Sequence, residues 1–392
     1  MEPARRQELK KLYYHTLVDN VVPFWLNHAL DREYGGYLNC LDRDGTVYDT
    51  DKAIWLQGRG VWLFSTLYNV LEPRAEWLEA ARIGYEFLAR HGYDSDGRMF
   101  FLVTRDGRPL VKRRYFFSET FAAIACAQYA KATGDDSAWD LAQRTFRLIV
   151  DLVRDPSRLT PKVNPATRRT ISHAIPMIML ATAQEFRLVD DDPLYDEVAG
   201  EAAEQILTRF MRPDKRAVFE NLNHDGSLML DTIDGRLVTP GHAIESAWFL
   251  MHEGRHRGED RYLRAALDIL RWMLDLGWDQ EHGGLLYFVD YLGKPPTRLE
   301  WDQKLWWPHT EALYALLLAH ELSGEAWCAE WYERVHAWSF EHFADPEYGE
   351  WYGYLHRDGS LLTPLKGGVW KGPFHLPRAL LYGYKLLAVS DH

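Results

Sequence analysis

Cysteine is scarce in this sequence, which has only Cys40, Cys126 and Cys328 among its 392 residues. Three thiols cannot form a disulfide framework, and no Cys-x-x-Cys pair indicates a zinc site. No apolar run approaches the length of a membrane span, and the amino-terminal segment lacks the apolar core of a signal peptide. These shortages argue against a disulfide scaffold, a zinc ribbon and a membrane protein, and we expect a cytoplasmic location.

Basic residues are also fewer than acidic ones: the chain has 45 lysines and arginines and 57 aspartates and glutamates, which gives a net charge of −12. Nucleic acids and anionic membranes both require a basic face, so neither is an expected partner. Aromatic residues, in contrast, make up 14% of the chain and include 16 tryptophans. Many of these rings are expected in the core, but aromatic rings also pack well against the C–H faces of sugars, so the composition suits a sugar-binding cleft.

A phrase of the form Asp-x-Glu-x-Gly-Gly-aromatic, intact or decayed, occurs six times at intervals of roughly 60–65 residues. The copies begin at Asp31, Asp94, Arg154, Arg212, Asp279 and Asp345, and the copy at Arg154 is degenerate. The alternating residues and the Asp-Gly turn that follow the phrase predict a short β-hairpin. A fixed long period predicts one structural unit used six times, closed into a ring so that no unit leaves an apolar face exposed.

Apolar residues at helical spacing predict two helices between successive phrases. Helices that follow a hairpin are expected over residues 53–71, 116–133, 173–186, 242–256, 305–322 and 374–389. Helices that precede a hairpin are expected over residues 4–30, 75–91, 137–153, 193–210, 261–276 and 326–343. The first set is apolar nearly all round and the second carries charge on one face, so the first should lie inside the second. The predicted fold is mainly α, a single (α/α)6-barrel domain over residues 1–392 with short β-hairpins on the active-site rim.

Ionisable and aromatic side chains recur at the first turns of the predicted inner helices, where unpaired N–H groups favour oxygen-rich ligands. They are Trp55, Arg59, Glu119, His173, His242, Glu245, Lys304, Trp306, His309, Glu311, His375 and Arg378. Polar groups in apolar helices are costly unless they are satisfied or hydrated, so their convergence predicts the active site. His242 and His375 occupy matching positions in two units and are the leading catalytic candidates. Burial or capping remains the alternative role for His173 and His309, and no metal site is predicted.

Several long motifs carry a resemblance to a known family. They include YDTDKAIWLQGRGVW, FLVTRDGRPL, TPGHAIESAWFL, LEWDQKLWWPHTEAL and KGGVWKGPFHLPR, and the similar region runs from about Val21 to Leu386. The sequence resembles the N-acylglucosamine 2-epimerase family, which includes the renin-binding protein of mammals. The resemblance implies an (α/α)6 barrel, usually a homodimer, that interconverts N-acetylglucosamine and N-acetylmannosamine. It implies that no cofactor is required for the chemistry and that ATP acts as an activator.

The resemblance also maps site residues onto this chain. It places the two acid/base histidines at His242 and His375, and the supporting charged residues at Arg59, Glu245 and Glu311. Epimerisation at C2 requires an opened ring, one base to take the C2 proton and one acid to return a proton to the other face. Two histidines on opposite sides of the barrel axis suit this reaction, and Arg59 suits the oxygen that gains negative charge. The substrate would also contact Trp55, Glu119, His173, Lys304, Trp306, His309 and Arg378.

Two departures from the family pattern leave alternatives open. The segment Arg154–Arg169 lacks the Gly/Lys-rich loop associated with nucleotide binding in bacterial relatives, which leaves activation by ATP open. His173 stands where N-acyl epimerases have an apolar residue, and relatives that act on unacetylated sugars carry a histidine nearby. The alternative function is therefore aldose–ketose isomerisation, or 2-epimerisation of a free sugar such as mannose or glucose. Glycoside hydrolysis would require two opposed carboxylates, and a purely protein-binding role would not require both histidines.

Overall fold

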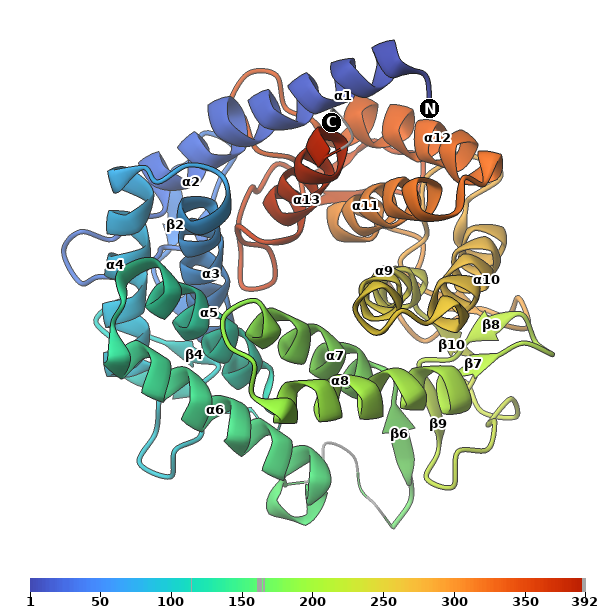
Figure 1. Cartoon of the computed structure of the whole chain (residues 1–392), viewed down its shortest axis with the longest axis horizontal. Coiled ribbons are helices and arrows are strands. Elements are labelled where there is room, and N and C mark those ends of the chain that lie inside the picture. The colour runs from blue at the N-terminus through green and yellow to red at the C-terminus, as the bar shows by residue number, and fades with distance from the viewer. Residues whose placement is uncertain (114, 161–163, 165, 390–392) are drawn as a thin grey trace.

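The helices form two concentric rings in the computed structural model, which describes residues 1–113, 115–160, 164 and 166–389 (Figure 1). Within these residues the inner ring consists of α3 (Ile54–Val70), α5 (Phe117–Thr133), α7 (Ala174–Arg187), α9 (Pro240–Arg257), α11 (Trp306–Ser323) and α13 (His375–Val389). The outer ring consists of α1 (Pro3–His15), η1 (Thr16–Val21), α2 (Val22–His28), α4 (Ala75–His91), α6 (Asp136–Arg154), α8 (Pro193–Gln205), η3 (Ile206–Phe210), α10 (Asp260–Gly277) and α12 (Ala326–Phe343). The short helix η2 (Pro156–Arg158) follows α6. This arrangement confirms the predicted (α/α)6 barrel.

The burial of the two rings follows their composition. Every side chain of α11 from Trp306 to Ala319 is buried, whereas α12 buries only one face. Three inner helices, α5, α9 and α11, end at a glycine with positive φ, namely Gly134, Gly258 and Gly324. A left-handed glycine at this position ends a helix and turns the chain without steric cost, so each inner helix passes directly into its outer neighbour.

Short strands lie at the end of the barrel where the inner helices begin. They are β1 (Cys40–Leu41), β2 (Val47–Asp49), β3 (Lys52–Ala53), β4 (Leu102–Val103), β5 (Pro109–Val111), β6 (Thr170–Ser172), β7 (Met211–Arg212), β8 (Ala217–Val218), β9 (Asn221–Asn223), β10 (Leu237–Val238), β11 (Val289–Asp290), β12 (Lys304–Leu305), β13 (Tyr354–Leu355) and β14 (Leu361–Thr363). Antiparallel hairpins form between β1 and β2, β4 and β5, β7 and β8, and β13 and β14. The strand before an inner helix pairs with a strand of the next unit, as β3 does with β4 and β12 with β13. Strand pairing therefore connects neighbouring units along the rim.

Three matching ion-pair clusters, which we call aspartate clasps, join neighbouring units at this rim. In each clasp the first aspartate of the repeated phrase pairs with a fully buried lysine and with an arginine of the next hairpin. The clasps are Asp31 with Lys52 and Arg105, Asp279 with Lys304 and Arg357, and Asp345 with Lys366 and Arg43. Burial raises the pKa of Asp31, but hydrogen bonds from Arg105 and Lys52 more than offset this effect and lower the pKa to about 2. Because Arg43 belongs to the first hairpin and Asp345 to the last, the third clasp closes the ring.

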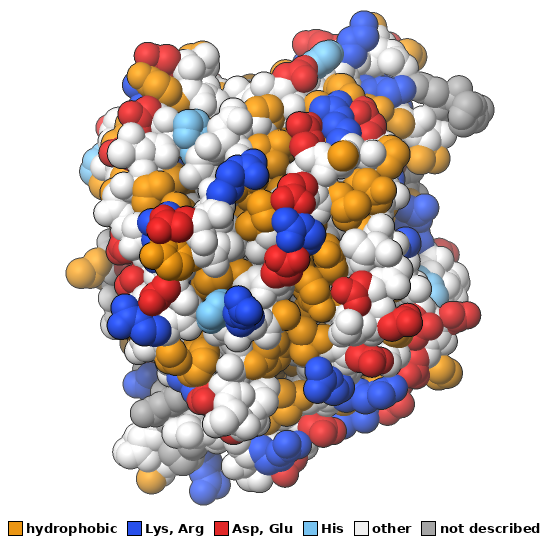
Figure 2. Space-filling view, turned by 90° about the vertical axis from the view of Figure 1, so that its left-hand side faces the viewer, with side chains coloured by type: hydrophobic (Ala, Val, Ile, Leu, Met, Phe, Trp, Pro, Cys, Tyr) orange, Lys and Arg blue, Asp and Glu red, His pale blue; other side chains and the backbone are white. Residues whose placement is uncertain are grey.

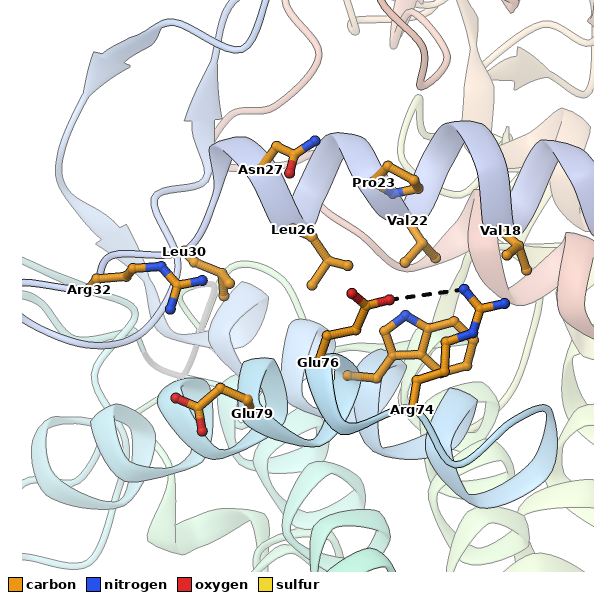
Figure 3. A pocket seen from close by; sticks show the side chains of 11 residues that line it. Val18, Val22, Pro23, Leu26, Asn27, Leu30, Arg32, Arg74, Glu76 and Glu79 are labelled. Atoms are coloured by element: carbon orange, nitrogen blue, oxygen red, sulfur yellow. Dashed lines mark ion pairs between the residues drawn. The ribbon is translucent and has the colours of Figure 1, made fainter.

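The outer wall carries charges of both signs. Figure 2 faces the side on which α2 and α4 lie, and acidic and basic side chains are interspersed there with apolar ones. A groove of about 340 Å³ runs between η1–α2 and α4, and its lining combines apolar side chains such as Val22 and Leu26 with charged ones such as Glu79 (Figure 3). Arg74 and Glu76 form an ion pair at its edge. Among the described residues, no helix has the length and apolar character needed to cross a bilayer.

Candidate active site

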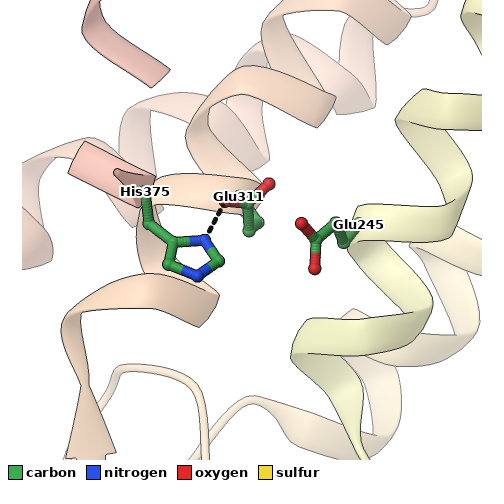
Figure 4. A group of neighbouring side chains, drawn as sticks. All are labelled: Glu245, Glu311 and His375. Atoms are coloured by element: carbon green, nitrogen blue, oxygen red, sulfur yellow. Dashed lines mark hydrogen bonds and ion pairs between the residues drawn. The ribbon is translucent and has the colours of Figure 1, made fainter. Parts of the chain in front are cut away.

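Four ionisable side chains form a hydrogen-bonded cluster inside the barrel, near the N-terminal ends of α9, α11 and α13. His375 Nδ1 lies 2.7 Å from Glu311 Oε1, and Arg378 Nη2 donates to Glu245 Oε1 at 2.6 Å and to Glu311 Oε1 at 2.7 Å. Figure 4 shows the two carboxylates and the imidazole of this cluster turned toward one another. Burial lowers the pKa of His375 well below its usual value, and the positive charge of Arg59 lowers it further. His375 is therefore a neutral imidazole near pH 7, able to accept a proton through Nε2.

Arg59 of α3 holds its positive charge beside this cluster. Its guanidinium lies over the rings of Trp55, Phe121 and Phe374, at 4.2, 4.1 and 4.7 Å from their centroids. Arg59 Nε has no hydrogen-bond partner among the described residues. Burial and the nearby Arg378 lower the pKa of Arg59 to about 9, so the guanidinium remains charged at neutral pH. A buried cation that retains an unused donor is suited to an oxygen atom that carries negative charge.

His242 forms a second histidine–carboxylate pair, with Glu220 rather than with either carboxylate of the first cluster. His242 Nδ1 lies 3.0 Å from Glu220 Oε2, and the side chain of His242 is 29% exposed. Burial raises the pKa of Glu220, but the charge and hydrogen bond of His242 more than offset it, so the pKa falls below its usual value. The ionised carboxylate accepts the Nδ1–H of His242, and in this tautomer Nε2 is the nitrogen that takes up a proton.

The ring of Trp307 brings the two histidines into one site. Its centroid lies 5.3 Å from that of His242 and 5.6 Å from that of His375. Trp307 belongs to α11, which lies between α9 and α13 in the inner ring (Figure 1). The histidines therefore flank one intervening helix instead of facing each other across the barrel axis. A Cβ atom added to Gly241 would lie only 2.5 Å from the Trp307 ring, so glycine is needed for this close approach.

Glu245, Glu311 and His375 also offer three ligand atoms within 4.8 Å of one another, a spacing that suits a divalent cation. However, Arg378 already donates to both carboxylates, and their charge raises its pKa despite its burial. A metal ion would have to displace this guanidinium and would lie close to Arg59. The donor set is therefore better suited to holding an arginine than a metal.

The other residues predicted for the site fall into two groups. Trp55 stacks on Arg59, Trp306 packs edge-on to His375, and His173 lies beneath the site, where its Nε2 is 3.0 Å from Ser246 Oγ. Burial lowers the pKa of His173 to about 4, so it is neutral near pH 7. The structure places these residues at or next to the cluster.

Lys304, His309 and Glu119 are instead engaged in the barrel wall. Lys304 is fully buried in an aspartate clasp. His309 accepts a hydrogen bond from Leu285 N–H through Nε2 and donates to the Leu305 carbonyl through Nδ1. Glu119 accepts hydrogen bonds from Arg98 and from the backbone of Met99. The structure does not bring these three side chains to the histidines.

A small cavity of about 40 Å³ lies between α5, α7, α9 and α13, with Glu245 and Arg378 in its lining. Glu185 of α7 also lines it and accepts hydrogen bonds from Trp62 Nε1 at 2.7 Å and from the Tyr382 hydroxyl at 2.9 Å. Burial raises the pKa of Glu185. The space is large enough for a few water molecules in contact with the carboxylates of Glu185 and Glu245.

Sequence reasoning missed Glu220 and Trp307. Trp307 follows Trp306 in a predicted inner helix, so an aromatic pair at the helix start was the available signal. Glu220 lies in RPDKRAVFENLNHDG, a weak copy of the repeated phrase that was interpreted only as a hairpin. The nucleotide-loop prediction concerned Arg154–Arg169, of which residues 161–163 and 165 lie outside the described residues.

Comparisons with known proteins identify a family that shares this sequence pattern. Residues 36–376 match the family described as N-acylglucosamine 2-epimerase (GlcNAc 2-epimerase). An N-acylglucosamine 2-epimerase of Bos taurus is 41% identical over 371 residues, which cover 93% of this chain and 87% of that protein. A cellobiose 2-epimerase of Bacteroides fragilis is 24% identical over 403 residues, which cover 96% of this chain and 97% of that protein. The solved cellobiose 2-epimerase of Bacillus thermoamylovorans superimposes with a TM-score of 0.85 over 97% of this chain and 99% of its own, at 20% identity. This last similarity supports the fold alone.

Proposed function

The chain belongs to the N-acylglucosamine 2-epimerase family, and on this basis we propose that it interconverts N-acetylglucosamine and N-acetylmannosamine. It is therefore an enzyme of the isomerase class. The observation that carries the reaction is the pair of histidines on one tryptophan ring, each with Nδ1 bonded to a carboxylate. Two such imidazoles provide two proton-transfer groups next to a single substrate carbon.

The reaction follows from the acidity of the C2 proton, which is appreciable only when C1 is an aldehyde in the opened sugar. A neutral imidazole Nε2 removes that proton, and the electron pair of the C–H bond forms a C1–C2 double bond while charge moves to O1. The other histidine, protonated, then delivers a proton to the opposite face of C2. Glu311 and Glu220 bond to Nδ1 of the two rings, so Nε2 is the atom that exchanges a proton with C2.

Arg59 is the residue best suited to the charge on O1. Its guanidinium is buried, and the aromatic rings beneath it fix its position. A donor held in place before the reaction does not need to reorganise as charge develops, which is the main source of stabilisation at such sites. Glu245 and Glu311 hold Arg378 and keep the net charge of the cluster balanced.

The alternative substrate, an unacetylated sugar, receives less support. The chain is 41% identical to an N-acylglucosamine 2-epimerase and 24% identical to a cellobiose 2-epimerase. His173, the sequence feature that favours a free sugar, is buried and has Nε2 engaged by Ser246. We accordingly propose the N-acetylated substrate, together with the homodimeric state that the family resemblance implies. The scarcity of cysteine and the lack of a signal-peptide core favour a cytoplasmic location, and activation by ATP stays an open part of the proposal.

The test is product identification by NMR after incubation with N-acetylglucosamine, N-acetylmannosamine, glucose and mannose, each with and without ATP. Conversion of the two N-acetylated sugars into each other, with deuterium from D2O at C2 of the product, is the expected result. His242→Ala and His375→Ala should each lose at least ~100-fold in rate, whereas His256→Ala, which alters an exposed histidine paired with Asp196, should not. A ketose product, or turnover of mannose alone, would instead establish the alternative.

A further inference from the structure

The two histidines of the site depend on different carboxylates. We propose that Glu220 is a positioning residue for His242, and that its loss impairs proton transfer at one face of C2 while the other face is served normally. This inference rests on the proposed epimerase function. It adds to that function a division of the site into two halves, Glu220–His242 and Glu311–His375.

Glu220 is held firmly by the backbone around it. Its N–H donates to the Leu237 carbonyl at 3.1 Å, and its carbonyl accepts the N–H of His173 at 2.9 Å. It lies between β8 and β9, and β9 pairs with β6 over three residues. The side chain is 12% exposed. A carboxylate fixed in this way can fix the ring plane and the tautomer of the imidazole that it contacts.

The surroundings of the two carboxylates differ. Glu311 accepts from His375, Arg378 and the indole of Trp248, so its charge is shared with a permanent cation. The titratable groups that face Glu220 are His242, His173 and Tyr287. Since His173 is neutral and Tyr287 uncharged near pH 7, His242 is the group on which Glu220 acts most strongly. Replacing Glu220 therefore alters one histidine, whereas replacing Glu311 disturbs the whole cluster.

The chemistry predicts an asymmetric consequence. From one epimer His242 breaks the C2–H bond and His375 forms the new one, and from the other epimer the order is reversed. Each step moves one proton between C2 and Nε2, and between the steps the electron pair of the broken C–H bond remains in the enolate, with its charge on O1. If only His242 is impaired, C–H cleavage becomes fully rate-limiting for the first epimer. For the second epimer, cleavage becomes a reversible step before slow reprotonation.

The experiment measures primary deuterium isotope effects on kcat/KM with both C2-deuterated epimers, in wild type and Glu220→Gln. We expect turnover to fall roughly 10- to 100-fold, the usual range for a residue that orients a reactive ligand. The isotope effect should rise for one epimer and fall toward unity for the other. Glu281→Gln is the control, because Glu281 is a largely exposed glutamate of the next unit that pairs with Arg357 and does not contact either histidine pair. It should leave turnover and both isotope effects unchanged.

Isotope effects that move in the same direction for both epimers, or unchanged turnover in Glu220→Gln, would overturn the proposal. If Glu220→Gln does not fold, Glu220→Asp, which keeps the charge and shortens the side chain, should give the same opposed shifts with smaller size. Failure of the proposed function is distinguishable, because wild type would then not incorporate deuterium at C2 of the product in D2O.

Discussion

Replacing Arg378 with methionine should expose the electrostatic cost of the active-site cluster. The guanidinium makes hydrogen bonds of 2.6 and 2.7 Å to Glu245 and Glu311, and all three side chains are at most 8% exposed. Hydrogen bonds to charged groups contribute about 1.5–3 kcal/mol each. Breaking a buried ion pair by removing one partner typically costs about 3–5 kcal/mol. We therefore expect Arg378→Met to lower the free energy of unfolding by about 3–5 kcal/mol at pH 8.

The loss should also depend on pH. Without Arg378, Glu245 and Glu311 are two buried negative charges that no longer share a guanidinium, so placing a proton between them relieves repulsion that exists only in the folded protein. Folding of the variant then takes up protons, and its stability falls as the pH rises. The deficit of Arg378→Met relative to wild type should therefore be largest at pH 8 and smaller at pH 5. Urea unfolding followed by circular dichroism at both values measures this difference.

A double variant tests whether the two carboxylates are the cause. Adding Glu245→Gln to Arg378→Met removes one of the two uncompensated charges, so the double variant should be more stable than Arg378→Met alone. Arg82→Met is the control, because Arg82 forms exposed ion pairs with Glu79 and Glu86 and should cost at most about 1 kcal/mol. A deficit that is equal at pH 5 and pH 8, or a double variant that is less stable still, would refute the reasoning.

Three further predictions follow from the same geometry. Arg59→Met should lower kcat/KM by about 100- to 1,000-fold in steady-state assays, because it removes the donor for O1, and its unfolding midpoint should change little by comparison. Gly241→Ala should displace Trp307, lowering the free energy of unfolding by about 1–3 kcal/mol and reducing epimerisation in the same protein preparation. Burial lowers the pKa of His309 to about 3 in the folded protein. Between about pH 6.5 and pH 3 this histidine is therefore protonated in the unfolded chain but neutral in the folded one, so the free energy of unfolding falls as the pH drops. His309→Asn should therefore remove about 2 kcal/mol of the stability difference between pH 7 and pH 5 in urea titrations.

The repeat predicted the fold because each unit satisfies the same packing requirement. The helix expected over 374–389 is observed as His375–Val389, and the helix expected over 193–210 is α8 continued by η3. The pattern did not reveal the aspartate clasps. The phrase that contains Asp31 predicts a turn, and only the folded ring shows that Lys52 and the next hairpin converge on that aspartate. Contacts between units depend on tertiary placement, which a local pattern does not contain.

The same limit explains which of the predicted site residues lie at the histidine–carboxylate cluster and which lie in the barrel wall. Selecting the first turns of inner helices fixes the height of a residue along the barrel but not the direction of its side chain. His309 and Glu311 are two residues apart on α11, so their side chains point to nearly opposite sides of the helix. Glu311 faces the barrel interior and bonds to His375, whereas His309 faces outward and stacks on Trp338 of α12 at 4.8 Å between centroids.

The placement of the histidines shows how a ring of similar units is adapted to a reaction at two faces of one carbon. In the proposed mechanism the repeat supplies both proton-transfer groups, because His242 lies near the start of α9 and His375 at the start of α13. The unit between them supplies Trp307 as the surface that both rings contact. Their carboxylates do not come from matching positions, because Glu311 lies on the inner helix α11 that precedes α13, whereas Glu220 does not lie on an inner helix. The second histidine obtains its carboxylate from the irregular segment between β8 and β9, which is why Glu220 escapes a search based on helical period. The asymmetry of the two halves is therefore a consequence of building a two-faced reaction on three neighbouring units of a sixfold ring.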